Sequence, residues 1–130
     1  MWSCGHGFGG RLGLDDENTT LVPKPVKVSG LSKWEACVAA SIGTDHSVLL
    51  MEHGSVWTFG LNTYHQLGHS PPPEKILSPK QIKTLKNVRA IGVSASKFHT
   101  VIWSKNQVGQ SSRFLLLIRC RFNSVFHFFP

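Results

Sequence analysis

Three glycines near the amino terminus have the spacing of a phosphate-binding turn. Gly5, Gly7 and Gly10 match G-x-G-x-x-G within the stretch CGHGFGGRLG. In dinucleotide-binding proteins such glycines let the backbone approach a pyrophosphate between a strand and a helix. Here the following segment contains Pro and Val and shows no helical period. The spacing is therefore weak evidence for a cofactor, and the sequence predicts no nucleotide site.

The glycine stretch occurs a second time, which indicates that its role is structural. WSCGHGFGGRLG aligns with WTFGLNTYHQLG, and Asn62 takes the place of Gly7. Asn tolerates a positive φ better than most residues, so we expect a left-handed backbone at this position in both copies. The other aligned pairs are Trp2 with Trp57, Gly5 with Gly60, Leu12 with Leu67, and Gly13 with Gly68.

A second pair of stretches places histidines at equivalent positions. AASIGTDHSVLL aligns with GVSASKFHTVIW, so His46 matches His99, and a hydroxyl residue follows each. A repeated position favours a hydrogen-bonded framework histidine over a metal ligand. His65 and His69 are four residues apart, but Gly68 and the following prolines place them in a turn rather than on a zinc-binding helix. We predict no metal site.

The cysteines do not indicate catalysis. Cys4, Cys37 and Cys120 form an odd set without a C-x-x-C pair, which predicts free thiols in a reducing compartment. We interpret them as small buried apolar residues rather than nucleophiles. Asp15, Asp16 and Glu17 lack the Asp-x-Asp series of a calcium loop and are expected in a solvated turn. The sequence thus predicts no catalytic residue and no cofactor.

Positive charge is concentrated in the second half of the chain. The net charge is +7, and seven cations lie between positions 71 and 108: Lys75, Lys80, Lys83, Lys86, Arg89, Lys97 and Lys105. Neither stacking aromatics nor a groove-reading helix accompanies them, so we expect a solvated rim rather than a nucleic-acid site. The longest apolar run, residues 114–118, is too short for a membrane span.

Short apolar runs separated by Gly and Pro predict antiparallel strands. We expect them at residues 26–28, 36–40, 47–51 and 55–59, and again at 88–93 and 100–103. Four strands in about 50 residues are typical of a propeller blade. The stretch HSPPPEKILSPK is interpreted as a stiff insertion between strands. The predicted fold is all-β, with about two four-stranded antiparallel blades of a partial β-propeller and a non-repeat tail.

The domain boundaries follow the repeat. The first repeat covers residues 2–56, and the second, incomplete, covers 57–108. The alignment is lost after Val108, so residues 109–130 are predicted to form a hydrophobic and basic tail outside the repeat fold. Its stretch RFLLLIRCRF could form a strand or a short helix, and both remain open. We expect removal of the tail to leave the sheets intact.

The repeated stretches carry a family resemblance. VWTFGLNTYHQLG and ASIGTDHSVLL resemble the two signature stretches of the regulator of chromosome condensation repeat. The sequence departs from the family pattern at Ile42, His65 and Ser96. The resemblance covers residues 2–108 and implies a β-propeller that binds other proteins. It marks as structural the twelve repeat residues Trp2, Gly5, Gly7, Leu12, Gly13, His46, Trp57, Gly60, Asn62, Leu67, Gly68 and His99.

This resemblance implies a non-enzymatic protein–protein interaction module without a small-molecule substrate. A closer resemblance, to the repeat region of an inhibitor that binds a cytoplasmic tyrosine kinase, implies such a kinase as the partner. It also implies that the chain is a truncated or alternative product of a longer repeat array. The alternatives are a guanine-nucleotide exchange factor or chromatin-binding fragment of the same family, and a product without function. The expected compartment is the cytoplasm, with the nucleus as the alternative.

Overall fold

A computed structural model describes residues 1–32, 35–105, 113–119 and 126–128 of the chain. Within these ranges the regular elements are strands and two short 3₁₀ turns, η1 (Phe8–Gly10) and η2 (Lys83–Leu85). The strands are β1 (Trp2–Gly5), β2 (Thr20–Pro25), β3 (Cys37–Ile42), β4 (His46–Met51), β5 (Val56–Leu61), β6 (Lys75–Gln81), β7 (Ala90–Ala95), β8 (His99–Lys105), β9 (Arg113–Arg119) and β10 (Phe126–Phe128).

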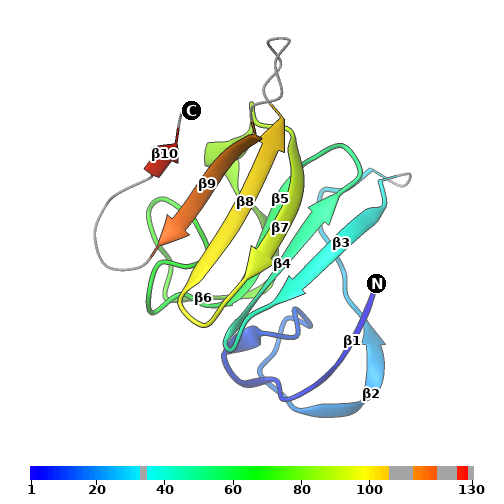
Figure 1. The fold of residues 1–130 in the computed structure, drawn as a ribbon. Helices are drawn as coiled ribbons and strands as arrows, with labels where there is room; N and C mark the ends of the chain where they lie inside the picture. Colours follow the sequence, from blue (N-terminus) through cyan, green and yellow to red (C-terminus); the bar gives the residue numbers. More distant parts are fainter. Residues whose placement is uncertain (33–34, 106–112, 120–125, 129–130) are drawn as a thin grey trace.

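The strands form three antiparallel sheets (Figure 1). One four-stranded sheet has the order β3-β4-β5-β6, and a second contains β7, β8, β9 and β10 in sequence order. The third contains β1 and β2 alone. Because Trp2 aligns with Trp57 of β5, this small sheet corresponds to the outer strand pair β5-β6 of the next repeat. The all-β class and the four-stranded antiparallel units are confirmed.

The first four-stranded sheet is covered on both faces. Its strand β4 is buried at all six positions. Since alternate side chains point to opposite faces, Val48 and Leu50 pack toward Ala90 and Ile102 of the second sheet. Leu49 and Met51 point the other way and pack with side chains including Trp57, Phe59 and Leu67. The two apolar clusters hold the blade between its neighbours, as repeat architectures require.

Most predicted strands of the repeat unit lie where they were expected, within one or two residues. The strand predicted at 26–28 is wrong, because β2 ends at Pro25. Strand β6 was missed, since its Pro79 and the preceding prolines indicated an insertion. Pro79 is tolerated because β6 lies at the edge of its sheet, where one side needs no ladder hydrogen bond. A register shift between Thr58 and Gly60 also lies opposite this part of β6.

The tail contributes β9, which settles the choice between strand and helix for this stretch. β9 pairs with β8 from His99 opposite Arg119 to Lys105 opposite Arg113. It thus takes, in the second four-stranded sheet, the place that β5 takes in the first. The domain boundary at residue 108 stays a prediction that a truncation can test. Cys120 lies outside the described residues.

Candidate functional site

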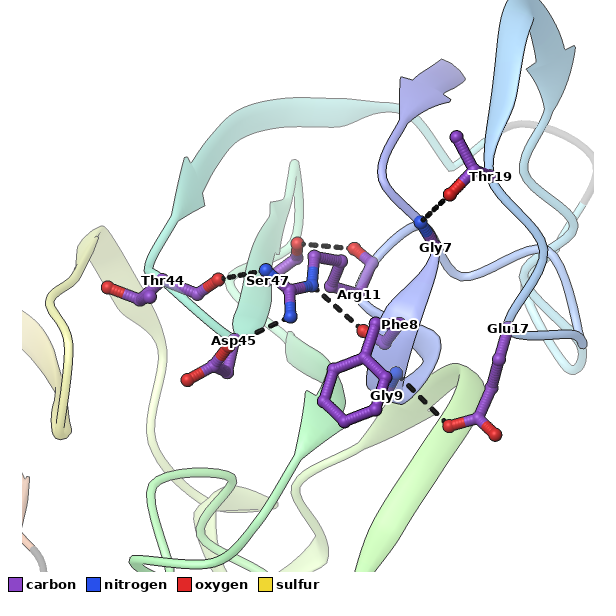
Figure 2. A network of polar contacts seen from close by, with 9 residues as sticks. All are labelled: Gly7, Phe8, Gly9, Arg11, Glu17, Thr19, Thr44, Asp45 and Ser47. Carbon is purple, nitrogen blue, oxygen red and sulfur yellow. Dashed lines mark hydrogen bonds and ion pairs between the residues drawn. The ribbon is translucent and has the colours of Figure 1, made fainter.

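An arginine joins the small amino-terminal sheet to the first complete blade (Figure 2). Arg11 follows η1 and donates from Nη1 to the carbonyl oxygen of Thr44 at 2.6 Å. Its Nη2 lies 2.9 Å from Oδ1 of Asp45, and its Nε donates to the carbonyl of Phe8 at 2.8 Å. The residues Thr44 and Asp45 form the turn between β3 and β4, so one guanidinium ties this turn to η1.

Three further contacts complete this first junction. Ser47 Oγ, on β4, donates to the carbonyl oxygen of Arg11 at 2.8 Å. Glu17 accepts from the backbone N–H of Gly9 at 3.1 Å through Oε1, while its Oε2 lies 2.9 Å from Nζ of Lys75. Glu17 therefore connects η1 to the first residue of β6. Figure 2 shows the contacts of Arg11 with Thr44, Asp45 and Ser47, and that of Glu17 with Gly9.

The second junction, between the two four-stranded sheets, repeats the central hydrogen bond of the first. Thr100 Oγ1 donates to the carbonyl oxygen of Gln66 at 2.7 Å. In the repeat alignment Thr100 matches Ser47 and Gln66 matches Arg11. The hydroxyl residue that follows each repeated histidine therefore donates to the equivalent carbonyl in the loop of the preceding sheet. The repeated hydroxyl is visible in the sequence, but its acceptor is not.

Other bonds of the repeat recur in the same way. Ser3 Oγ donates to the carbonyl of Leu12 at 2.8 Å, and its counterpart Thr58 donates to the carbonyl of Leu67 at the same distance. Ser41 Oγ adds a bond between sheets by accepting from the backbone N–H of Ala95 at 2.8 Å. Small hydroxyl residues thus carry the polar connections inside and between repeats.

His46 belongs to the second junction. Its Nε2 lies 2.9 Å from Thr100 Oγ1. Since the single hydroxyl hydrogen of Thr100 goes to the carbonyl of Gln66, His46 must donate from Nε2 and carry a lone pair on Nδ1. Burial lowers the pKa of His46 to about 4, a shift that nearby His99 reinforces and Asp45 opposes. The imidazole is therefore neutral at neutral pH.

The repeated histidines occupy different surroundings. His46 is fully buried, while His99 is half-buried and has no side-chain hydrogen bond within the described part of the chain. His65 lies in a turn with φ 58°, as its sequence context indicated. His69 Nε2 lies 3.0 Å from Thr58 Oγ1, and burial lowers its pKa to about 4.

The glycine positions need correction in one respect. Gly7 has φ −88°, so the predicted left-handed backbone at Gly7 and Asn62 is wrong. Gly7 is required because a Cβ there would collide with the backbone carbonyl of Asn18. At the equivalent position Asn62 instead binds its own loop, donating to the carbonyl of Pro73 at 2.6 Å and accepting from the N–H of Leu67 at 3.0 Å.

Left-handed backbone recurs at three neighbouring repeat positions instead. The matched φ values are 116° and 115° at Gly5 and Gly60, 79° and 58° at Gly10 and His65, and 68° and 72° at Gly13 and Gly68. At Gly60 the side of the chain that a Cβ would occupy is filled by the backbone of Asp45 and His46. These glycines serve the turn and the strand contact rather than a phosphate.

The repeated apolar residues are buried to different degrees. Trp57 is 7% exposed, whereas Trp2 at the equivalent position is 67% exposed. Leu12 and Leu67 are both buried. Contrary to expectation, the free cysteines Cys4 and Cys37 are exposed. Across the described ranges no three His, Cys, Asp or Glu side chains come together as a metal site would require.

Comparison with known proteins identifies the class. The model of the regulator of chromosome condensation (RCC1) repeat matches residues 1–50 and 53–103, and a second model of the same repeat matches residues 37–66. The chain therefore belongs to the RCC1 repeat family. The structure of human WBSCR16 superimposes with a TM-score of 0.71 at 18% identity, covering 88% of this chain and 27% of that one. No helix in the described part of the chain is long and apolar enough to cross a membrane.

Particular relatives are more similar in sequence. The Inhibitor of Bruton tyrosine kinase of Xenopus laevis is 50% identical over 110 residues, which cover 83% of this chain. The human E3 ubiquitin-protein ligase HERC2 is 29% identical over 120 residues, covering 85% of this chain. The chain spans only 8% of the first relative and 2% of the second. It is an RCC1-repeat protein similar to part of the Bruton tyrosine kinase inhibitor.

Proposed function

We propose that the chain is a non-enzymatic protein–protein interaction module whose partner is a cytoplasmic tyrosine kinase. The observation that carries this proposal is the high identity, along most of the chain, to a protein named as an inhibitor of Bruton tyrosine kinase. Identity of this level extends over both repeats and exceeds the 29% identity to HERC2. We expect the module to act in the cytoplasm, where such a kinase would meet it.

The use of the repeat residues supports a scaffold role. Ser47 and Thr100 donate to backbone carbonyls in the loops of the preceding sheet, and His46 binds Thr100. The hydroxyl groups of Ser47 and Thr100 and the imidazole of His46 thus make their hydrogen bonds within the protein. These bonds fix the blades relative to one another. Rigid blades present their connecting loops at constant positions, an arrangement that suits recognition of another protein.

Exposed apolar side chains supply contact area. Leu21 is 89% exposed and Val22 is 69% exposed, and both lie on β2. Ile42, at the end of β3, is 75% exposed. Each of these side chains is available for apolar contact with a protein partner.

Surface plasmon resonance with immobilised Bruton tyrosine kinase tests the proposal. We expect saturable binding of the 130-residue chain and slower kinase autophosphorylation in its presence. A second, unrelated tyrosine kinase on the reference surface controls for general adhesion. Circular dichroism on the same sample establishes that the chain is folded. A folded chain that fails to bind, or that binds both kinases equally, would contradict the proposed partner.

A further inference from the structure

A cleft of about 200 Å³ opens beside the turn between β4 and β5. One wall is formed by residues 53–56 and the other by residues 81–82 and 85–89. The cleft lies at the opposite end of β4 from Asp45 and the polar junction shown in Figure 2. It is therefore separate from the polar contacts of the first junction.

The cleft is held in shape by backbone contacts. The carbonyl oxygen of Gly54 accepts from the N–H of Ala90 at 3.0 Å, and Ile82 donates to the carbonyl of Val56 at 2.9 Å. Gly54 has φ 88°, and a Cβ there would lie 2.5 Å from Cγ of Arg89. The glycine thus permits the stem of Arg89 to cross the turn, which fixes where this side chain begins.

The lining of the cleft is cationic. Lys86 and Arg89 contribute to it, His53 lies opposite, and none of the lining residues is acidic. In the part of the chain that the structure describes, the ion pairs are formed by Arg11 and Lys75, so Lys86 and Arg89 are left available. The carboxylate of Glu35 accepts from Ser55 Oγ at 3.2 Å at one wall, which limits the positive potential there.

We propose that this cleft binds an acidic peptide segment of a protein partner, with one Asp or Glu side chain seated between Lys86 and Arg89. This inference rests on the proposed interaction function and assigns it a contact surface. A volume of about 200 Å³ would hold several waters of about 30 Å³ each, or one carboxylate side chain. The Arg89 guanidinium can bind a carboxylate with two parallel hydrogen bonds.

A protein partner fits the lining better than a nucleic acid does. Single-stranded nucleic acids bind where aromatic side chains stack on the bases. The lining contains no Phe, Tyr or Trp, and its accessible apolar members are aliphatic, the half-buried Leu85 and the exposed Val88. Aliphatic side chains beside cations match a peptide that alternates acidic and apolar residues.

Fluorescence anisotropy with a labelled peptide containing a block of Glu and Leu tests the proposal on the intact chain. We expect the double variant Lys86→Gln with Arg89→Gln to bind about tenfold more weakly, since two exposed charge contacts each contribute up to about fivefold. The matched control is Lys24→Gln with Lys27→Gln, which removes the same charge from exposed positions outside the cleft. It should change binding less than twofold.

The alternative outcomes are distinct. Equal weakening by both double variants, or equal binding of a Gln-for-Glu peptide, would show that only net charge matters and would overturn the proposal. Tighter binding of a single-stranded oligonucleotide through Lys86 and Arg89 would also overturn it. If the chain binds the Glu peptide as expected but does not bind the kinase, the proposed kinase partner is refuted and the cleft proposal stands. A chain that binds the kinase but not the peptide refutes the cleft alone.

Discussion

Replacement of Thr100 by Val tests the hydrogen bond that joins the two four-stranded sheets. Val keeps the shape and the β-branched backbone preference of Thr, so the hydroxyl is the only polar group removed. Thr100 and His46 are both fully buried. The substitution leaves the Nε2–H of His46 without an acceptor and the carbonyl of Gln66 without this donor. Water cannot replace either partner without opening the junction.

The expected cost follows from those two groups. A buried polar group left without its partner costs about 1–3 kcal/mol, and two such groups in one network are not fully additive. We therefore expect the free energy of unfolding to fall by about 2–4 kcal/mol. The entropy of unfolding is about 2.1 cal/mol/K per residue, which for 130 residues converts this loss into a decrease in Tm of about 10 °C.

Two controls accompany the measurement, which is thermal and urea unfolding followed by circular dichroism. Thr100→Ser keeps the hydroxyl, as Ser47 does at the first junction, and should cost only about 1 kcal/mol for the lost methyl group. Thr84→Val makes the same substitution at an exposed position and should change stability by less than about 0.5 kcal/mol. If Thr100→Val is no more destabilising than Thr84→Val, the junction does not depend on this hydroxyl.

Three further predictions concern other parts of the chain. Burial lowers the pKa of His46 from 6.5 to about 4, so the free energy of unfolding should be at its full value above pH 6.5 and fall by about 3 kcal/mol as the pH drops to about 4. The variant His46→Gln, unfolded in the same buffers, should show a flatter pH profile. The slope that remains in this variant is due to His69. Gly7→Asn should lower the free energy of unfolding in urea by about 1–3 kcal/mol, because the Cβ of the new side chain meets the backbone of Asn18. This is expected even though Asn62 occupies the equivalent position of the other repeat. A variant as stable as the wild type would contradict the prediction. Deletion of residues 109–130, followed by calorimetry, tests the domain boundary. The sequence predicts that the shortened chain keeps a cooperative unfolding transition and is more soluble. Loss of the transition would show that the fold requires β9.

The repeat could be found from sequence because each of its positions meets the same structural requirement in both copies. Gly60 must leave room for the backbone of Asp45, and Leu67 must fill the core, so both residue types recur at fixed spacing. The strand predictions worked for the same reason, since β4 and β5 are apolar between turn residues. The class of fold and the family follow from such repeated signals.

The errors arose where a residue depends on a contact that its own sequence surroundings do not reveal. Gly7 is a glycine because of the carbonyl of Asn18, and no local signal shows that contact. Strand β6 carries Pro79, which its edge position tolerates, but an edge is known only from the sheet order. The role of Thr100 likewise depends on the carbonyl of Gln66, 34 positions earlier in the chain. The cleft beside Arg89 likewise forms between segments that are separate in the sequence, so it could not be predicted.

The two junctions share one hydroxyl–carbonyl bond but differ in the ionisable group beside it. At the first, Arg11 and Asp45 are 21% and 29% exposed, so their ion pair contributes at most about 1 kcal/mol and is weakened by salt. At the second, His46 is buried and neutral, so it responds to pH and is indifferent to salt. Added salt should therefore loosen η1 from the turn at Asp45 while leaving the two large sheets together. Acid should weaken the second junction, because protonation of His46 at Nδ1 places a buried positive charge there while its Nε2–H bond to Thr100 is kept. Salt and acid thus act on different junctions.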